Sequence, residues 1–388
     1  MFGWNTSRKT RYGMLIDIGS GSVSAGITTS NASATKPDLV WSMQQIISLE
    51  EHHNQKDVLE KIIGALKNVF EASGNAGIRA LKAYDRNGQI SYVQIGVSAP
   101  WSYTITKKVV LVHDKEFELT ESILEQAENE AEQQAKKELD SLTEGQNRNI
   151  SMTFSKTIAT ETKGYVVAVP FGEKMNKITL SRLFCYVDSR LMNVIDEYCE
   201  RIFPSIEYSV HSFMSLFYFA IRDLPINTSE LCIADITSEA IEIGVIRNGI
   251  LEHTTHIQSG ARSIASELTR FGNFSHKDTS AYLRDDSTTP THCKFTVEEA
   301  CALCEAQIAK EMELEAGIVT IPNTLLFHTN AKTESFFKER LVTAFRQVHG
   351  GNVTPLAAPK LFDAHTSEMS ALLISAYVFK DTFHQLNV

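Results

Sequence analysis

The stretch "MLIDIGSGSV", residues 14–23, contains an apolar segment that ends at Asp17 and Ile18, followed by two glycines and two serines. A Gly/Ser-rich turn of this kind lets successive backbone N–H groups point inward and cradle an anion. Three phosphate-binding turns share this composition: the P-loop, the dinucleotide-binding turn and a hairpin between two strands. The residues after the turn decide which of the three is present.

The segment after the turn predicts a strand, and this favours the hairpin. A P-loop needs a lysine after its last glycine, and none follows Gly21. The dinucleotide fingerprint needs a helix and a third glycine, but Ser24 stands at that position. Val23, Ala25 and Ile27 alternate with polar or small residues, as they do in a strand. On this stretch alone, a hairpin turn without a ligand remains the alternative.

A second copy of the motif strengthens the phosphate-binding interpretation. The segment "DITSEAIEIGV" (235–245) aligns with "DIGSGSVSAGI" (17–27) at a constant offset of 218 residues. Asp, Ile, Ser and Gly recur at matching positions, and three further positions are apolar in both copies. A third predicted strand follows each copy. Two such units predict duplicated halves that face each other across a cleft, with a nucleotide between them.

The remaining sequence predicts how these halves are completed. A helix over 57–73 and a strand over 91–99 follow the first three-strand unit. A strand, a long charged helix and two further strands then predict a small α+β insertion at 93–181. The expected division is a first half of 1–92 and 182–227, and a second half of 228–388 with a helical subdomain at about 269–319.

Length and composition limit the classes of function. At 388 residues the chain is expected to form two or more domains or subdomains. Its 43% hydrophobic and 22% charged residues are typical of a soluble globular protein. The formal net charge of -10 argues against broad binding to nucleic acid. No apolar run approaches the roughly 20 residues that span a bilayer, so we expect a cytoplasmic protein whose contact with a membrane is indirect.

The paired hairpins resemble those of the actin-like ATPase superfamily. The opening hairpin, the stretch "YVQIGVSAPW" (92–101) and the predicted insertion are similar to its PilM-type pilus assembly and FtsA-type cell division branch. The resemblance implies an α/β fold of two duplicated actin-like (ribonuclease H-like) halves around a nucleotide cleft, with an SHS2-like inserted subdomain. The nucleotide-binding residues that it implies are Asp17, Gly19, Ser20, Gly21 and Ser22 on the first hairpin, Asp235, Thr237 and Ser238 on the second, and Gly260 at the start of the next helix.

The cofactors implied by the resemblance are ATP and Mg, with Asp17 and Asp235 holding the metal through water. Three departures from the family pattern argue against hydrolysis. The second hairpin carries Glu239 in place of a small residue, and this carboxylate either faces the cleft and repels phosphate or points to solvent. His211 stands where the family commonly has a water-positioning Glu, and "TLLFHTNAKT" (324–333) lacks the Gly pair that backs the adenine. We therefore expect at most a weak ATPase, assign no catalytic residue and favour a non-catalytic scaffold.

For function, the resemblance implies a cytoplasmic scaffold of a type IV pilus or related envelope machine. Such a scaffold binds the short cytoplasmic tail of a single-span membrane protein in a groove beside the inserted subdomain, and so lies at the inner face of the cell membrane. An FtsA-like division protein, which self-associates into filaments and recruits a tubulin-like filament, is the alternative. Its basic amphipathic end is not matched by "SALLISAYVFKDTFHQLNV" (370–388), in which Lys380 is the single Lys or Arg. A small-molecule kinase is less favoured because it needs an intact phosphate cleft.

Overall fold

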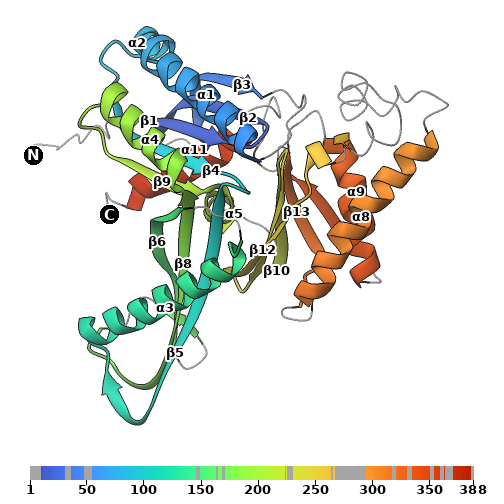
Figure 1. Ribbon diagram of the computed structural model, residues 1–388. Helices are drawn as coiled ribbons and strands as arrows, with labels where there is room; N and C mark the ends of the chain where they lie inside the picture. Colours follow the sequence, from blue (N-terminus) through green and yellow to red (C-terminus); the bar gives the residue numbers. More distant parts are fainter. Residues whose placement is uncertain are drawn as a thin grey trace, which may run out of the picture.

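The computed structural model consists of three β-sheets with flanking helices (Figure 1). The residues described are 10–30, 36–47, 55–145, 149–162, 165–167, 171–222, 224, 230–263, 265–266, 294–316, 320–329, 334–349, 354–358, 362 and 370–385. Within these ranges, no helix combines the length and the apolar content that crossing a membrane requires.

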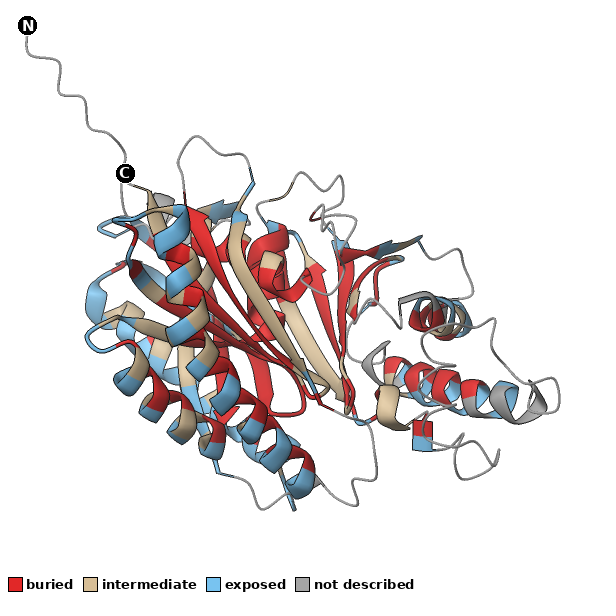
Figure 2. Ribbon diagram, turned by 90° about the horizontal axis from the view of Figure 1, so that it is seen from above, coloured by how far each residue is buried: buried red, intermediate tan, exposed pale blue. Residues whose placement is uncertain are grey.

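The first sheet joins three antiparallel strands to two parallel ones, in the order β3-β2-β1-β4-β9. Its strands are β1 (Arg11–Ile18), β2 (Ser22–Ser30), β3 (Asp38–Ile46), β4 (Ile90–Val97) and β9 (Tyr208–Ser212). Its outer helices are α1 (Gln55–Ala72), the π-helical turn η1 (Ser73–Gly77), α2 (Ile78–Tyr84) and α4 (Ser189–Ile202). Nearly every residue of β1 is buried, because helices cover both faces of this sheet (Figure 2).

The second sheet repeats this arrangement, in the order β12-β11-β10-β13-β14. Its strands are β10 (Glu230–Ile236), β11 (Ile241–Arg247), β12 (Ile250–Ile257), β13 (Thr324–Thr329) and β14 (Thr354–Ala357), and its outer helices are α8 (Lys294–Ala316) and α9 (Glu334–His349). A turn at Asn248 and Gly249 joins β11 to β12, and both residues have positive φ, as a tight hairpin requires. The repeated order and directions of the strands confirm the expected fold of two duplicated halves.

Two helices link the halves by crossing from one to the other. Helix α5 (Phe213–Arg222) follows β9 of the first half, yet it packs on β10 of the second. Helix α11 (Ser370–Gln385) follows the second half, yet it packs on β1 and β2 of the first. The two helices also contact each other, and α5 is buried from Phe213 to Ile221. This exchange puts the ends of β1 and β10, with their aspartates, between the two halves.

The inserted unit is a four-stranded sheet of order β5-β8-β6-β7, covered by one helix (Figure 1). Its elements are β5 (Ser102–Glu118), α3 (Glu121–Leu142), β6 (Ile150–Thr162), β7 (Tyr165–Val167) and β8 (Lys174–Asp188). Helix α3 presents a buried stripe at every fourth position, formed by Ala127, Ala131, Ala135 and Leu139. Small side chains in this stripe let the helix lie close to the sheet.

The boundaries of this unit differ from the expected 93–181. Strand β4 pairs with β1 and belongs to the first half, so the inserted sheet begins at Ser102. At the other end it extends to Asp188, because β8 is its central strand and pairs with both β5 and β6. The alternation in β8 is interrupted by charged residues, and the sequence pattern therefore did not mark it as a strand. Of the expected helical subdomain at 269–319, the described part is mainly α8.

Candidate functional site

The two Gly/Ser hairpins come together between the halves and touch. The backbone N–H of Glu239 donates a hydrogen bond of 2.9 Å to Ser20 Oγ. A Cβ on Gly21 would lie 3.2 Å from Ser238 Cβ, so the two turns are in van der Waals contact. Both Ser20 and Ser238 are buried. The structure thus brings the predicted residues of both motifs to one place, in direct contact.

Gly19 and Ser22 shape the first hairpin from within. The N–H of Gly19 donates to the carbonyl oxygen of Ser22 at 2.9 Å and closes the turn. The Ser22 hydroxyl lies 3.4 Å from Gln44 Nε2 on β3. These two predicted residues therefore stabilise the turn and its neighbouring strand.

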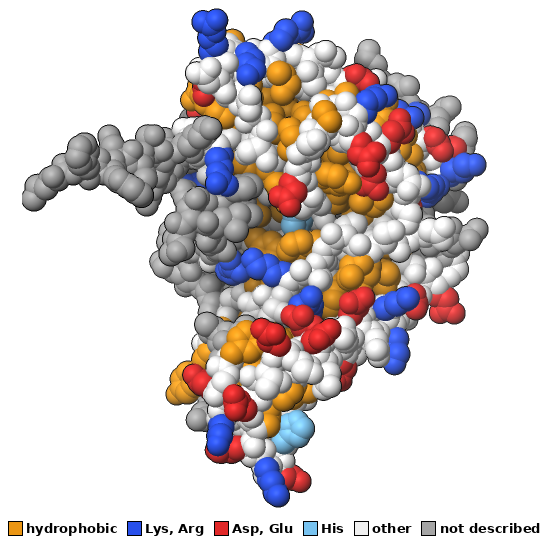
Figure 3. Space-filling model, turned by 90° about the vertical axis from the view of Figure 1, so that its left-hand side faces the viewer, with side chains coloured by type: hydrophobic (Ala, Val, Ile, Leu, Met, Phe, Trp, Pro, Cys, Tyr) orange, Lys and Arg blue, Asp and Glu red, His pale blue; other side chains and the backbone are white. Residues whose placement is uncertain are grey.

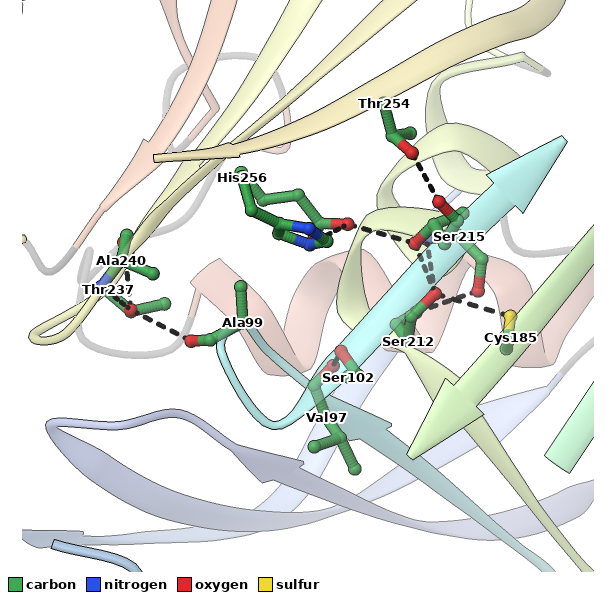
Figure 4. A network of polar contacts seen from close by, with 12 residues as sticks. Val97, Ala99, Ser102, Cys185, Ser212, Ser215, Thr237, Ala240, Thr254 and His256 are labelled. Carbon is green, nitrogen blue, oxygen red and sulfur yellow. Dashed lines mark hydrogen bonds and ion pairs between the residues drawn. The ribbon is translucent and has the colours of Figure 1, made fainter. Parts of the chain in front are cut away.

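The second hairpin is held by the hydroxyl of Thr237. This Oγ1 accepts a hydrogen bond of 3.2 Å from the N–H of Ala240. It also lies within donating distance of two carbonyl oxygens, 3.0 Å from that of Ala240 and 3.1 Å from that of Ala99 (Figure 4). Ala99 belongs to the turn between β4 and the inserted sheet. The Thr237 hydroxyl thus joins the second half to that turn.

Gly260 lies against the second hairpin with no room for a side chain. A Cβ at this position would come within 2.5 Å of the carbonyl oxygens of Thr237 and Ser238. The next two backbone N–H groups are satisfied by the same hairpin: Ala261 donates to Thr237 at 3.2 Å and Arg262 donates to Ser238 at 2.8 Å. N–H groups at the start of a helix are the usual donors to a phosphate. Here they are used by protein carbonyls.

The carboxylate of Glu239 matches neither of the expectations from the sequence, which were repulsion of a phosphate in the cleft or exposure to solvent. It forms an ion pair of 2.7 Å with Arg262 Nε, and its side chain is almost wholly buried. Burial raises the pKa of Glu239, and the positive charge of Arg262 opposes that rise. Arg262 therefore compensates the charge that would otherwise repel a phosphate, and the pair ties the hairpin to the segment after Gly260.

Beneath the hairpins lie the two aspartates. Asp235 Oδ1 is 2.8 Å from His328 Nδ1, and His328 Nε2 is 2.9 Å from the hydroxyl of Ser370 at the start of α11. Asp17 is 6% exposed and Asp235 is 1% exposed. Asp17 Oδ1 and Asp235 Oδ2 have no hydrogen-bond partner among the residues that the structure describes. Burial raises the pKa of Asp17 to about 7, with His328 opposing the rise and Asp235 adding to it.

Sequence reasoning missed a buried polar network next to the aspartates. Glu242 of β11 is fully buried, and its Oε1 lies 3.1 Å from Thr104 Oγ1 and 3.2 Å from His256 Nε2. The Thr104 hydroxyl is also 2.7 Å from that of Ser212, and its carbonyl accepts a hydrogen bond from Thr254 (Figure 4). These residues belong to the inserted sheet, the first half and the second half. The network therefore joins all three units.

One strand separates His211 from Asp17, because Asp17 pairs with Gly96 of β4 and Gly96 pairs with His211 of β9. Its ring packs against Phe154 of β6 in a tilted arrangement, with 4.4 Å between centroids, and its Nε2 is 2.8 Å from Ser209 Oγ. Burial, aided by the charge of Lys156, lowers the pKa of His211 to about 4. This residue packs the inserted sheet against β9.

The depressed pKa of His211 predicts an acid-dependent loss of stability. The unfolded chain binds a proton near pH 6.5 and the folded chain near pH 4, so stability is lost as the pH falls between these values. Each pKa unit corresponds to about 1.4 kcal/mol, and we expect His211→Gln to remove up to about 3 kcal/mol of this loss. Urea unfolding across that pH range measures it. His113→Gln, at an exposed position on β5, is the control and should leave the profile unchanged.

The described arrangement fits a cation better than it fits a nucleotide. Two buried carboxylates, each with a buried oxygen that has no hydrogen-bond partner among the described residues, are suitable for a hydrated Mg ion. The hairpins, in contrast, touch each other, and the backbone N–H donors named above are bonded to protein oxygens, which are carbonyls or the Ser20 hydroxyl. A phosphate between the hairpins would require them to separate. Mg-ATP therefore does not fit the hairpins as they stand.

Two duplicated α/β halves, each with an aspartate at the end of its first strand, define the actin-like ATPase fold, and solved structures agree. A chain of the PilM–PilN type IV pilus biogenesis complex matches with a TM-score of 0.59 and 12% identity, over 95% of this chain and 98% of that one. Diol dehydratase-reactivating factor in a nucleotide-free form matches with a TM-score of 0.52 and 7% identity, over 97% of this chain and 100% of that one. No family model and no curated protein matches the chain. The chain has the actin-like ATPase fold.

Proposed function

We propose that the protein is a non-catalytic, actin-like scaffold that binds the short cytoplasmic tail of a single-span membrane protein, as part of a type IV pilus or related envelope machine. The proposal rests on the direct contact between the first and second hairpins. Their backbone N–H groups donate to protein oxygens and not to a phosphate. An enzyme of this fold needs that space for its nucleotide, whereas a scaffold does not. The likeness to a chain of the PilM–PilN complex, over nearly the whole length of both chains, supports the pilus assignment.

The tail-binding groove that we propose lies between the inserted sheet and the first half. Phe154 of β6 contacts His211 of β9 and lies 6.2 Å, between centroids, from Phe219 of α5. Lys156 and Arg222 approach the Phe219 ring at 5.4 and 5.6 Å. Hydrophobic side chains gather on this side of the molecule (Figure 3). An extended tail would place apolar side chains against Phe154, which is half-buried, and its carbonyl or acidic groups near the two cations.

The proposed groove predicts which partner is recovered from membranes. Affinity capture from native membranes is expected to recover a single-span protein, and a synthetic peptide of its cytoplasmic tail should then bind the purified chain. Phe154→Ala is expected to weaken peptide binding at least about tenfold, or about 1.4 kcal/mol. Tyr165→Ala is the matched control, because Tyr165 is an exposed aromatic residue of the same sheet on β7.

Two outcomes would contradict this assignment. Recovery of a tubulin-like filament alone would favour the division protein. Equal peptide affinity in the Phe154→Ala and Tyr165→Ala variants would exclude the aromatic cluster as the binding site, even if the partner itself is a membrane protein. We place the protein at the inner face of the cell membrane through this partner, and the capture experiment tests that location as well.

A further inference from the structure

We propose that the two hairpins form a protein clasp that closes the cleft between the halves without a nucleotide. The clasp consists of Ser20 and Gly21 on the first half and Ser238 and Glu239 on the second. In a nucleotide-dependent protein of this shape, the ligand supplies the contacts between the halves. In this chain, the hairpins supply them directly.

The contact between the halves uses groups that a phosphate would otherwise use. The N–H of Glu239 would be free to donate to an anion, but it donates to Ser20 Oγ at 2.9 Å. The absence of a side chain at Gly21 lets its backbone reach Ser238, because a Cβ would come within 3.2 Å of Ser238 Cβ. Ser20 and Ser238 are both buried. The clasp therefore has both a hydrogen bond and close packing.

Three sets of contacts hold the second hairpin in the position where it touches the first hairpin. Glu239 is bound to Arg262, and Gly260 leaves the space in which the backbone of the hairpin lies. The Thr237 hydroxyl holds the hairpin to the Ala99 carbonyl of the turn that precedes the inserted sheet. Fixing these groups before closure reduces the entropy that closure costs. None of these contacts requires a ligand.

The aspartate of the second half also has a protein partner. Asp235 Oδ1 is bound to His328, which in turn contacts Ser370 at the start of α11. Helix α11 packs on β1 and β2 of the first half, so this chain of hydrogen bonds runs from the second half to the helix that covers the first. It is a second, independent set of protein contacts across the cleft.

The clasp can be tested by measuring the distance between the halves. Spin labels carried on unnatural amino acids at Arg79 of α2 and Glu339 of α9, both exposed, report that distance by pulsed electron paramagnetic resonance. The clasp predicts one narrow distance distribution in nucleotide-free protein, unchanged by millimolar Mg-ATP. Gly21→Leu should widen the distribution and shift it to longer distances. Gly64→Leu is the control, since a Cβ at Gly64 meets nothing within 4 Å.

The following results would contradict the proposed clasp. A broad distribution in nucleotide-free protein that narrows with Mg-ATP would mean that the ligand closes the cleft. An unchanged distribution in Gly21→Leu would mean that the hairpin contact does not hold the halves. If Gly21→Leu does not fold, Ser20→Ala removes the acceptor of the hydrogen bond alone and should still broaden the distribution. An unchanged distribution in Ser20→Ala would then reject the proposal.

Discussion

Gly260→Ala is expected to lower the free energy of unfolding by about 3 kcal/mol. The added Cβ would come within 2.5 Å of the carbonyl oxygens of Thr237 and Ser238, and these are backbone atoms that cannot rotate away. The second hairpin must therefore shift, which disturbs its contact with Ser20 as well. Urea or thermal unfolding of the full chain measures the loss.

Gly64→Ala is the matched control for this substitution. Gly64 lies inside α1, and an added Cβ meets nothing within 4 Å. Alanine favours a helix over glycine by about 1 kcal/mol, so this variant should be slightly more stable than the wild type. Equal stability of Gly260→Ala and the wild type would mean that the hairpin does not pack against Gly260.

Asp17→Asn is expected to stabilise the protein by about 2–4 kcal/mol at about pH 8. The pKa of Asp17 is raised from 3.8 to about 7 in the folded chain, chiefly by burial. The folded chain therefore holds a proton that the unfolded chain has lost, and wild-type stability falls as the pH rises from about 4 to about 7. The amide cannot ionise, so the variant should not show this fall.

The pH dependence separates this effect from ordinary repacking. Below about pH 4, Asp17 is protonated in both the folded and the unfolded chain, and the variant should match the wild type closely. Asp38→Asn, at an exposed position on β3, is the control and should show no stabilisation at either pH. Thermal unfolding followed by circular dichroism is sufficient. A loss of stability in Asp17→Asn at about pH 8 would mean that burial does not raise the pKa of Asp17.

The repeated hairpins were the part of the sequence from which the fold could be predicted. Asp17 and Asp235 are each followed by a turn and an alternating strand, and that local pattern alone predicted two similar halves. The fold followed because hairpin registers are determined by short-range sequence. The inserted sheet begins and ends at other residues than the expected 93–181, because β8 is recognised as a strand by its two partners and not by its own pattern.

The arrangement of the candidate site could not be predicted, because it depends on contacts between residues that are far apart in the sequence. Glu242 occupies the position of Ser24 in the offset alignment. A single carboxylate on an otherwise apolar strand could have indicated a buried polar contact. Its partners Thr104 and His256, however, come from separate elements. The direct contact of the hairpins likewise depends on how the halves pack, and a Gly/Ser-rich turn is compatible with either a phosphate or a second hairpin as its neighbour.

In-cell photo-crosslinking tests the scaffold assignment most directly. A photo-reactive amino acid at Arg222, beside the proposed groove, is compared with one at Lys136 on the exposed face of α3. If the groove binds the tail, the Arg222 probe forms an adduct with the cytoplasmic tail of one single-span membrane protein, and the Lys136 probe does not. Adducts with a tubulin-like protein alone, or the same membrane protein captured equally at both positions, would contradict it.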